Sequence, residues 1–311
     1  MIFNRHLVVS FAAAFVALGA AHASTRTLHV GSEVETDLSM PSPWGTDYKA
    51  SLSGLNGVFS FQFSPMFIAA LNTAKVSLGE EEPAVVLADY NSTTSTTGIV
   101  TTRLRSAKLA APVTSLTGEF VGDQALIEQV TSVGGMALST IKNGATNGAG
   151  FLTISNLQLD LARGAVLADI TGGNGVGSLS GFQLWNYTAV TGPTSYAAPD
   201  FGGVLDPFAM REVRGSNGFT GLFASQQSLD MIAQALNLNA IGRASLTFAN
   251  DPLRGQGEGF GSLTFNFSVR MNGPVSVALA VPEPSSCAML AAGGLCAAWF
   301  ARRRRAAQPS A

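Results

Sequence analysis

The strongest constraint on the fold is a strict alternation of apolar and polar residues across residues 262–271, which read SLTFNFSVRM. Successive side chains of a β-strand point to opposite faces, so this pattern buries one face and leaves the other polar. In a helix the same apolar residues would be scattered around the whole circumference. The pattern therefore predicts a long strand. After a turn at residues 272–274 the alternation resumes across residues 275–281, which predicts a terminal hairpin or an extended tether.

Weaker patterns of the same kind predict strands along much of the preceding chain, separated by turns rich in Gly, Ser, Thr and Asn. Phe59, Phe61 and Phe63 alternate with small or polar residues and should form a buried row on one strand. The apolar phase of residues 151–161 shifts at Ser155-Asn156, as a β-bulge requires. Strands are expected at residues 27–34, 57–64, 99–109, 151–161, 166–170 and 181–188, and residues 91–98 are expected to form a Ser/Thr-rich loop.

A few segments have helical signals instead. Ser64 and Pro65 supply an N-cap and a first-turn proline for a helix over residues 66–74. An apolar stripe at helical spacing, with Ser225 as a candidate N-cap, predicts a second helix over residues 225–236. A similar spacing favours a third helix over residues 123–131. Together with the strands, these signals predict a mainly β fold, an antiparallel β-sandwich or jelly-roll-like body with two or three short helices.

The composition of residues 24–280 excludes several chemistries. Both cysteines of the chain, Cys287 and Cys296, lie after this stretch, so it has no disulfide or thiol chemistry. His29 is its only histidine and lies near the mature N-terminus, where fraying is expected, so neither a Ser-His-Asp triad nor a multi-histidine metal site is expected. Its 13 Lys and Arg against 19 Asp and Glu form no basic stripe, so nucleic acid is not an expected partner. The glycine-rich residues 172–177 lack the Lys-Ser/Thr of a phosphate loop and are interpreted as a turn, and no cofactor or metal is expected.

A pair of carboxylates is the catalytic arrangement that the composition leaves open. Glycoside hydrolysis needs two acids about 5–10 Å apart in the fold, and these need not be neighbours in the chain. The central acids stand in no recognisable motif and are interpreted as turn or surface residues, so we expect no enzyme. These acids are Asp160, Asp169, Asp200, Asp206 and Glu212.

Residues 1–23 are typical of a secretory signal peptide. A basic start and an apolar core precede Ala21-His22-Ala23, in which Ala21 and Ala23 form a small-x-small cleavage site. Cleavage there makes Ser24 the first residue of the exported body, residues 24–280. Export through the Sec translocon is therefore expected.

The C-terminal residues combine three features in order. Pro282, Glu283 and Pro284 should form an extended, accessible stretch, because proline disfavours both helix interiors and strand ladders. Residues 287–301 are apolar and, as a helix, about 23 Å long, which suffices for a thin transmembrane span. Four arginines then hold the adjacent end in the cytoplasm, with residues 306–311 as a cytoplasmic tail and the body on the far side. The arginines are Arg302, Arg303, Arg304 and Arg305.

Over residues 281–305 this combination resembles the PEP-CTERM sorting signal of exported Gram-negative bacterial proteins. The resemblance implies that an exosortase, an integral-membrane cysteine transpeptidase, cuts near Pro282-Glu283-Pro284 and releases or re-anchors the protein. It also implies a transient anchor in the inner membrane, followed by a location in the cell envelope, on the surface or outside the cell. An ordinary single-span anchor, in which the prolines serve only as a linker, is the alternative.

The resemblance favours a non-enzymatic envelope or extracellular-matrix protein associated with exopolysaccharide or biofilm, because proteins with this signal tend to occur in bacteria that make such matrices. A secreted carbohydrate-binding module on the same body is the first alternative, with exposed aromatic rings stacking on sugars. A glycan-active hydrolase is the second. The candidate carbohydrate contacts are Trp185, Tyr187 and Tyr196, together with Trp44 and Phe201.

Overall fold

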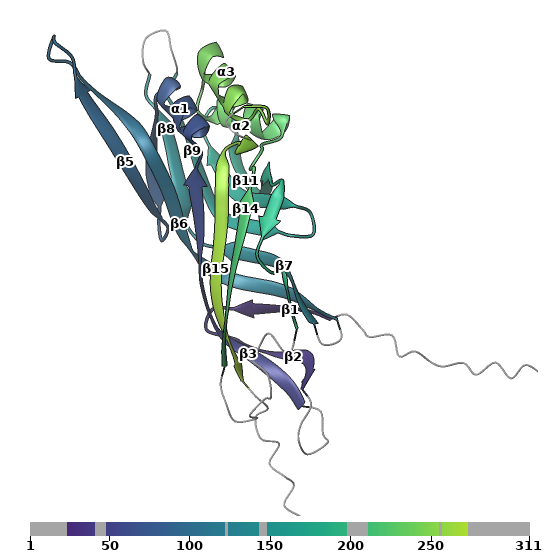
Figure 1. Cartoon of the computed structure of the whole chain (residues 1–311). Coiled ribbons are helices and arrows are strands. Elements are labelled where there is room, and N and C mark those ends of the chain that lie inside the picture. Colours follow the sequence, from purple (N-terminus) through teal and green to yellow (C-terminus); the bar gives the residue numbers. More distant parts are fainter. Residues whose placement is uncertain are drawn as a thin grey trace, which may run out of the picture.

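The computed structural model describes residues 24–40, 48–121, 124–142, 148–197, 211–254 and 257–272. The expected signal peptide (residues 1–23), the second arm of the terminal hairpin (275–281), the sorting segment (281–305) and the cytoplasmic tail (306–311) lie outside these residues. The described chain is mainly β-strand, with three short helices gathered at one end of an elongated body (Figure 1). The predicted fold class, a mainly β antiparallel body with short helices, is confirmed.

Every pairing between the named strands is antiparallel. The strands are β1 (Ser24–His29), β2 (Glu33–Met40), β3 (Tyr48–Phe63), β4 (Val76–Glu81), β5 (Val85–Thr94), β6 (Val100–Val121), β7 (Gln124–Ser132), β8 (Gly135–Thr140), β9 (Gly150–Asp160), β10 (Ala165–Gly172), β11 (Gly177–Asn186), β12 (Ala189–Thr191), β13 (Ser195–Ala197), β14 (Arg211–Thr220) and β15 (Gly261–Asn272). The helices are α1 (Pro65–Thr73), α2 (Gln226–Ala235) and α3 (Ala240–Ala249).

The long strand β6 belongs to both halves of the sheet. Residues 108–112 of β6 pair with one edge of β3, and the opposite edge of β3 pairs with β15, followed by β14 and β12. The first residues of β3 also pair with β2. Residues 113–121 of β6 pair with β7, which leads on to β9, β10 and β11. One strand therefore joins two sets of strands by continuous hydrogen bonding.

The two halves face each other across an aromatic core. Phe61 of β3 stacks on Trp185 of β11 with ring centroids 4.9 Å apart, although these strands lie in opposite halves of the strand order. Tyr196 and Phe267 meet edge to face at 5.8 Å across the same interface. Because such contacts join residues far apart along the sheet, the open sheet must be folded over on itself, with its core between the halves.

The alternation predicted for residues 262–271 is confirmed in β15. Its apolar side chains are buried, and Phe265 lies 5.5 Å from Phe59 of the neighbouring strand β3. Phe59, Phe61 and Phe63 are all buried on one face, as expected. The bulge predicted at Ser155-Asn156 is also present, because Asn156 has a positive φ of 53° and the pairing of β9 with β10 shifts there.

Two of the predicted helices begin at the expected caps. The Ser64 hydroxyl accepts a hydrogen bond from the Phe67 backbone N–H at the start of α1, with Pro65 in the first turn. Ser225 caps α2 by accepting from the Ser228 N–H. The third helix, α3, was not predicted. Its N-cap is Asn239, and it packs beside α1 at the end of the body (Figure 1).

The helix predicted over residues 123–131 is wrong, because this segment is strand β7. Ile127 and Val130 are three residues apart and both are buried, which is the spacing of a helix face. In the structure the pairing of β6 with β7 shifts between Thr117 and Gly118, so that Glu128 is an extra residue on β7. This bulge brings both apolar side chains to the same face of a strand.

Two other boundaries also differ from the prediction. The leading strand expected over residues 27–34 is divided into β1 and β2 by a turn in which Gly31 adopts a φ of 79°. The segment 91–98, expected as a loop, continues β5 as far as Thr94 before the turn into β6. In both cases the backbone hydrogen bonds to a neighbouring strand determine where the strand ends.

The facing aromatic core predicts a large difference between two phenylalanine truncations. Phe61→Ala should lower the free energy of unfolding by about 3–5 kcal/mol, because it removes a buried ring and leaves a cavity against Trp185. Phe248→Ala, at an exposed ring of α3, should cost under about 1 kcal/mol. Urea unfolding of both variants followed by tryptophan fluorescence measures the difference. Equal costs would show that the two halves do not depend on this contact.

Candidate functional site

Two of the predicted carbohydrate contacts are buried in the core. Trp185 is 1% exposed and Tyr196 is 8% exposed, so neither ring has a free face for a sugar. The prediction is wrong for these residues, because both rings point between the halves of the sheet and pack on phenylalanines. Tyr187 is only half-buried. Trp44 and Phe201 lie outside the described residues.

Tyr187 lines an open groove that we take as the candidate site. The groove has a volume of about 500 Å³, counted as the space that the centre of a water-sized sphere can occupy. Its walls come from the ends of β6 and β7, the turn after β9 and the segments around β12 and β13. The lining residues are Glu119, Leu126, Ile127, Glu128, Leu161, Ala162, Tyr187, Val190, Gly192 and Thr194.

The Tyr187 ring is held in place by contacts on three sides. Its backbone N–H donates to the Gly164 carbonyl at 3.3 Å, and its hydroxyl donates to the Leu161 carbonyl at 3.4 Å. The ring meets Phe219 edge to face at 5.0 Å. Burial, and secondarily the negative charge of Asp160, raises the pKa of Tyr187 above its usual value, so the phenol stays neutral. A fixed, neutral aromatic ring thus forms part of the groove wall.

Two carboxylates stand in the same groove. Glu119 comes from β6, and Glu128 is the bulge residue of β7. The Glu128 carbonyl accepts a hydrogen bond from the Leu161 N–H at 2.8 Å, which ties the groove floor to the end of β9. Carboxylate oxygens accept hydrogen bonds from hydroxyl groups, and their charge disfavours anionic ligands. A neutral polyhydroxyl ligand matches this combination of ring and carboxylates.

Sequence reasoning identified Tyr187 but missed Glu119, Glu128 and Thr194. These residues come from segments far apart in the chain and share no motif. The only sequence signal for Glu119 and Glu128 was an acidic residue within an otherwise apolar alternating segment. At Glu128 the bulge interrupts the alternation, so this signal could not be recognised.

The described acids that were candidates for glycoside hydrolysis mostly form hydrogen bonds or ion pairs with nearby residues. Asp160 accepts from the Arg163 N–H at 2.9 Å and forms an ion pair with its side chain in the β9–β10 turn. Glu212 pairs with Arg214 on the surface of β14. Asp200 and Asp206 lie outside the described residues. In the described part of the chain, no group of three or more His, Cys, Asp or Glu is placed to hold a metal ion.

Asp169 bridges two irregular points of the β9–β10–β11 region. It accepts hydrogen bonds from the Ser180 hydroxyl at 2.6 Å, the Asn156 amide at 2.9 Å and the Gly181 N–H at 3.0 Å. These bonds, above all that from Ser180, favour the ionised form and hold the pKa of Asp169 below its usual value despite partial burial. Asp169 thus links the bulge at Asn156 to the turn of β11 at Gly181.

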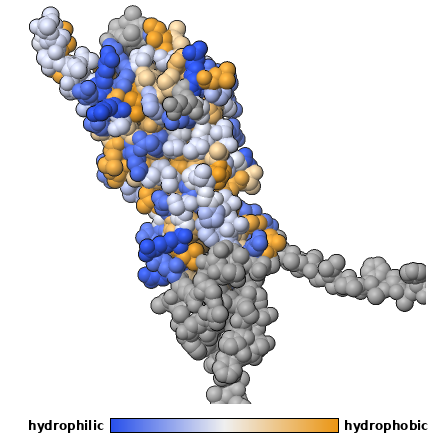
Figure 2. Space-filling model, viewed as in Figure 1, coloured by the Kyte–Doolittle hydropathy of each residue, from blue (hydrophilic) through white to orange (hydrophobic). Residues whose placement is uncertain are grey.

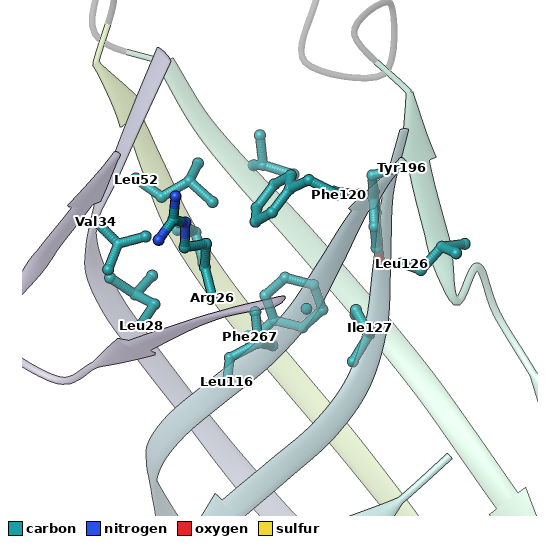
Figure 3. A pocket seen from close by; sticks show the side chains of 14 residues that line it. Arg26, Leu28, Val34, Leu52, Leu116, Phe120, Leu126, Ile127, Tyr196 and Phe267 are labelled. Atoms are coloured by element: carbon teal, nitrogen blue, oxygen red, sulfur yellow. The ribbon is translucent and has the colours of Figure 1, made fainter. Parts of the chain in front are cut away.

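A second cavity lies between the two halves, near β1 and β2 (Figure 3). Its volume, counted in the same way as that of the groove, is about 50 Å³. Side chains such as Leu28, Phe120, Ile127 and Phe267 line it, and Arg26 is the one charged residue among them (Figure 3). A cavity this small and apolar has no set of polar groups to orient a sugar. We therefore assign it to the core.

At the C-terminal tail, residues 280–305 match the family model of the PEP-CTERM protein-sorting motif. The motif thus begins a short distance beyond β15, which ends at Asn272. It supports an exported protein that is sorted by an exosortase, a membrane protein, after a transient C-terminal membrane anchor. No curated protein matches the chain.

The residues predicted to act in sorting have no described geometry. Ala21, Ala23, Pro282-Glu283-Pro284 and Arg302 to Arg305 all lie outside the described residues, as does the expected membrane span at residues 287–301. None of the helices that the structure describes is long and apolar enough to cross a membrane.

The hydrogen bonds of Asp169 predict a pH-dependent contribution to stability. Because the folded pKa lies below the unfolded value, this contribution is complete above the usual value of 3.8 and is lost as pH falls through the folded pKa. Asp169→Asn should therefore lower Tm at pH 7, and the difference from wild type should shrink below about pH 4. Thermal melts from pH 2 to 7 measure it. Asp230→Asn, at an exposed residue of α2, is the control, and a constant difference for Asp169→Asn would contradict the assignment.

Proposed function

We propose that this chain is a non-enzymatic envelope or extracellular-matrix protein whose β-body binds neutral exopolysaccharide after sorting by an exosortase. The match of residues 280–305 to the sorting motif carries the first part of the proposal. In it, the signal at residues 1–23 directs export through the Sec translocon, and Arg302 to Arg305 hold the tail in the cytoplasm until cleavage near Pro282-Glu283-Pro284.

The groove around Tyr187 supports the polysaccharide part. The half-buried ring of Tyr187 offers an apolar surface to the C–H face of a sugar. The residue is held by hydrogen bonds from its backbone N–H to the Gly164 carbonyl and from its hydroxyl to the Leu161 carbonyl. Glu119 and Glu128 supply acceptors for sugar hydroxyl groups beside it. In this role the body is a carbohydrate-binding module, and the carboxylates act as hydrogen-bond acceptors, with no bond cleavage.

Sorting is tested by changing the proline-flanked acid. With the exosortase present, the mature chain should lack Arg302 to Arg305, whereas a Pro282→Ala/Glu283→Ala variant should retain them in the membrane fraction. Fractionation and intact-mass analysis, in cells with and without the host exosortase, measure both. Ser285→Ala/Ser286→Ala, next to the tripeptide, is the matched control and should be processed normally. Identical masses in both strains would leave a plain membrane anchor.

Polysaccharide binding is tested at Tyr187. Tyr187→Ala should weaken binding about tenfold, because an aromatic contact contributes about 0.5–1.5 kcal/mol beyond the surface that it buries, and about 1.4 kcal/mol corresponds to a tenfold change in affinity. Tyr187→Phe should keep most of the affinity, since the ring remains. Affinity electrophoresis in gels containing the host's purified exopolysaccharide, a neutral glucan or alginate measures binding, and the anionic alginate should bind least because of Glu119 and Glu128.

Phe248→Ala is the control, because Phe248 is an exposed aromatic residue of α3 outside the groove. Thermal melts of each variant establish that it is folded. If Phe248→Ala and Tyr187→Ala lose equal affinity, or if neither loses any, the groove is not the binding site. Sorting through the tail would be unaffected by that result.

A further inference from the structure

The hairpin of β5 and β6 carries an unusual concentration of exposed apolar side chains. Its distal part, residues 85–102, is here called the arm, and its tip stands apart from the helices (Figure 1). Leu87 is 61% exposed and Ile99 is 65% exposed. Val85, Tyr90 and Val100 are exposed as well. Monomeric soluble proteins rarely expose large contiguous apolar patches, and such patches often mark a site of association.

The outer edge of β5 is open. Among the described strands, β5 pairs only with β6, over the full length from Val85 to Thr94. At the start of this edge the Val86 N–H points away from β6 and meets the Glu80 carboxylate at 3.4 Å. A strand edge presents further backbone donors and acceptors in the same direction, and these suit pairing with another strand.

The arm lacks the usual protection of an edge strand. Asp89 is the only charged residue among residues 85–102, which contain no proline. Strand β2, which pairs only with β3 among the described strands, instead carries Glu33, Glu35 and Asp37. Figure 2 shows the arm at the upper left mostly in the pale colours of residues that are neither strongly hydrophilic nor hydrophobic. Charge therefore does little to oppose strand pairing at β5.

We propose that two copies of this chain associate by antiparallel pairing of their β5 strands. A strand edge paired with its own copy about a twofold axis places each donor opposite an acceptor, so one surface serves both partners. The exposed rows that include Val85 and Leu87 then meet their counterparts across the axis. The tail adds to this, because anchoring copies in one membrane raises their local concentration.

Cysteine cross-linking of the full-length chain tests the pairing. Cys287→Ser/Cys296→Ser removes every native cysteine, after which Leu87→Cys, Ala88→Cys, Asp89→Cys, Tyr90→Cys and Asn91→Cys each place one thiol at a successive position of β5. In a symmetric antiparallel pair only the residue on the twofold axis faces its own copy. The variant at that position should form a disulfide-linked dimer in membranes of producing cells, because paired Cα atoms across an antiparallel ladder lie about 4.5–5.5 Å apart. Ile241→Cys on α3 is the matched control, since Ile241 is 60% exposed.

Sedimentation of the purified full-length chain in detergent gives an independent measurement. Wild type should form dimers, and Leu87→Lys should weaken association at least tenfold by placing two positive charges at the interface. Ile241→Lys should leave association unchanged, and thermal melts should show both variants folded. A monomeric wild type at 100 μM, or cross-linking at β5 no better than at Ile241, would overturn the proposal. A cross-link from β5 that forms only to a different protein would also overturn the proposal. The Tyr187 groove plays no part in these readouts.

Discussion

The body depends on the packing of the two halves of its sheet across the aromatic core, of which the Phe61–Trp185 stack is the clearest contact. A flat open sheet would leave the phenylalanine row of β3 in water. Folding the sheet over buries that row against the opposite half, at roughly 25 cal/mol for each Å² of apolar surface removed from water. Because β6 hydrogen-bonds in both halves, the chain changes from one half to the other without interrupting its ladder.

Strand β6 also relates the two surfaces to which we assign functions. Its first residues form one side of the arm, and Glu119 near its other end lines the Tyr187 groove. A 22-residue strand extends about 70 Å if straight, so binding at the groove and association at the arm need not compete for space. A matrix protein with these two surfaces would link polysaccharide chains through paired copies, and the sorting motif at residues 280–305 would determine where the pairs form.

Local patterns predicted those elements whose burial follows their own periodicity. The row at Phe59, Phe61 and Phe63, the caps at Ser64 and Ser225, and the bulge at Asn156 were each predicted from neighbouring residues alone. Prediction failed at β7, where a bulge at Glu128 gives a strand the spacing of a helix. It failed again at Trp185, because the neighbouring residues do not show whether an aromatic ring meets a sugar or another ring.

By itself the sequence determined that the body is mainly β, that it lacks cysteine and that a sorting motif follows it, because alternation, composition and a contiguous motif are local properties of the chain. Only the tertiary structure decided which tyrosine stays partly open, which acids stand beside it and which edge among the described strands is left without a partner. Those properties depend on which distant strands become neighbours. Thus Trp185 is buried by Phe61, more than a hundred residues earlier in the chain, and Tyr187 shares its groove with Glu119 from another strand.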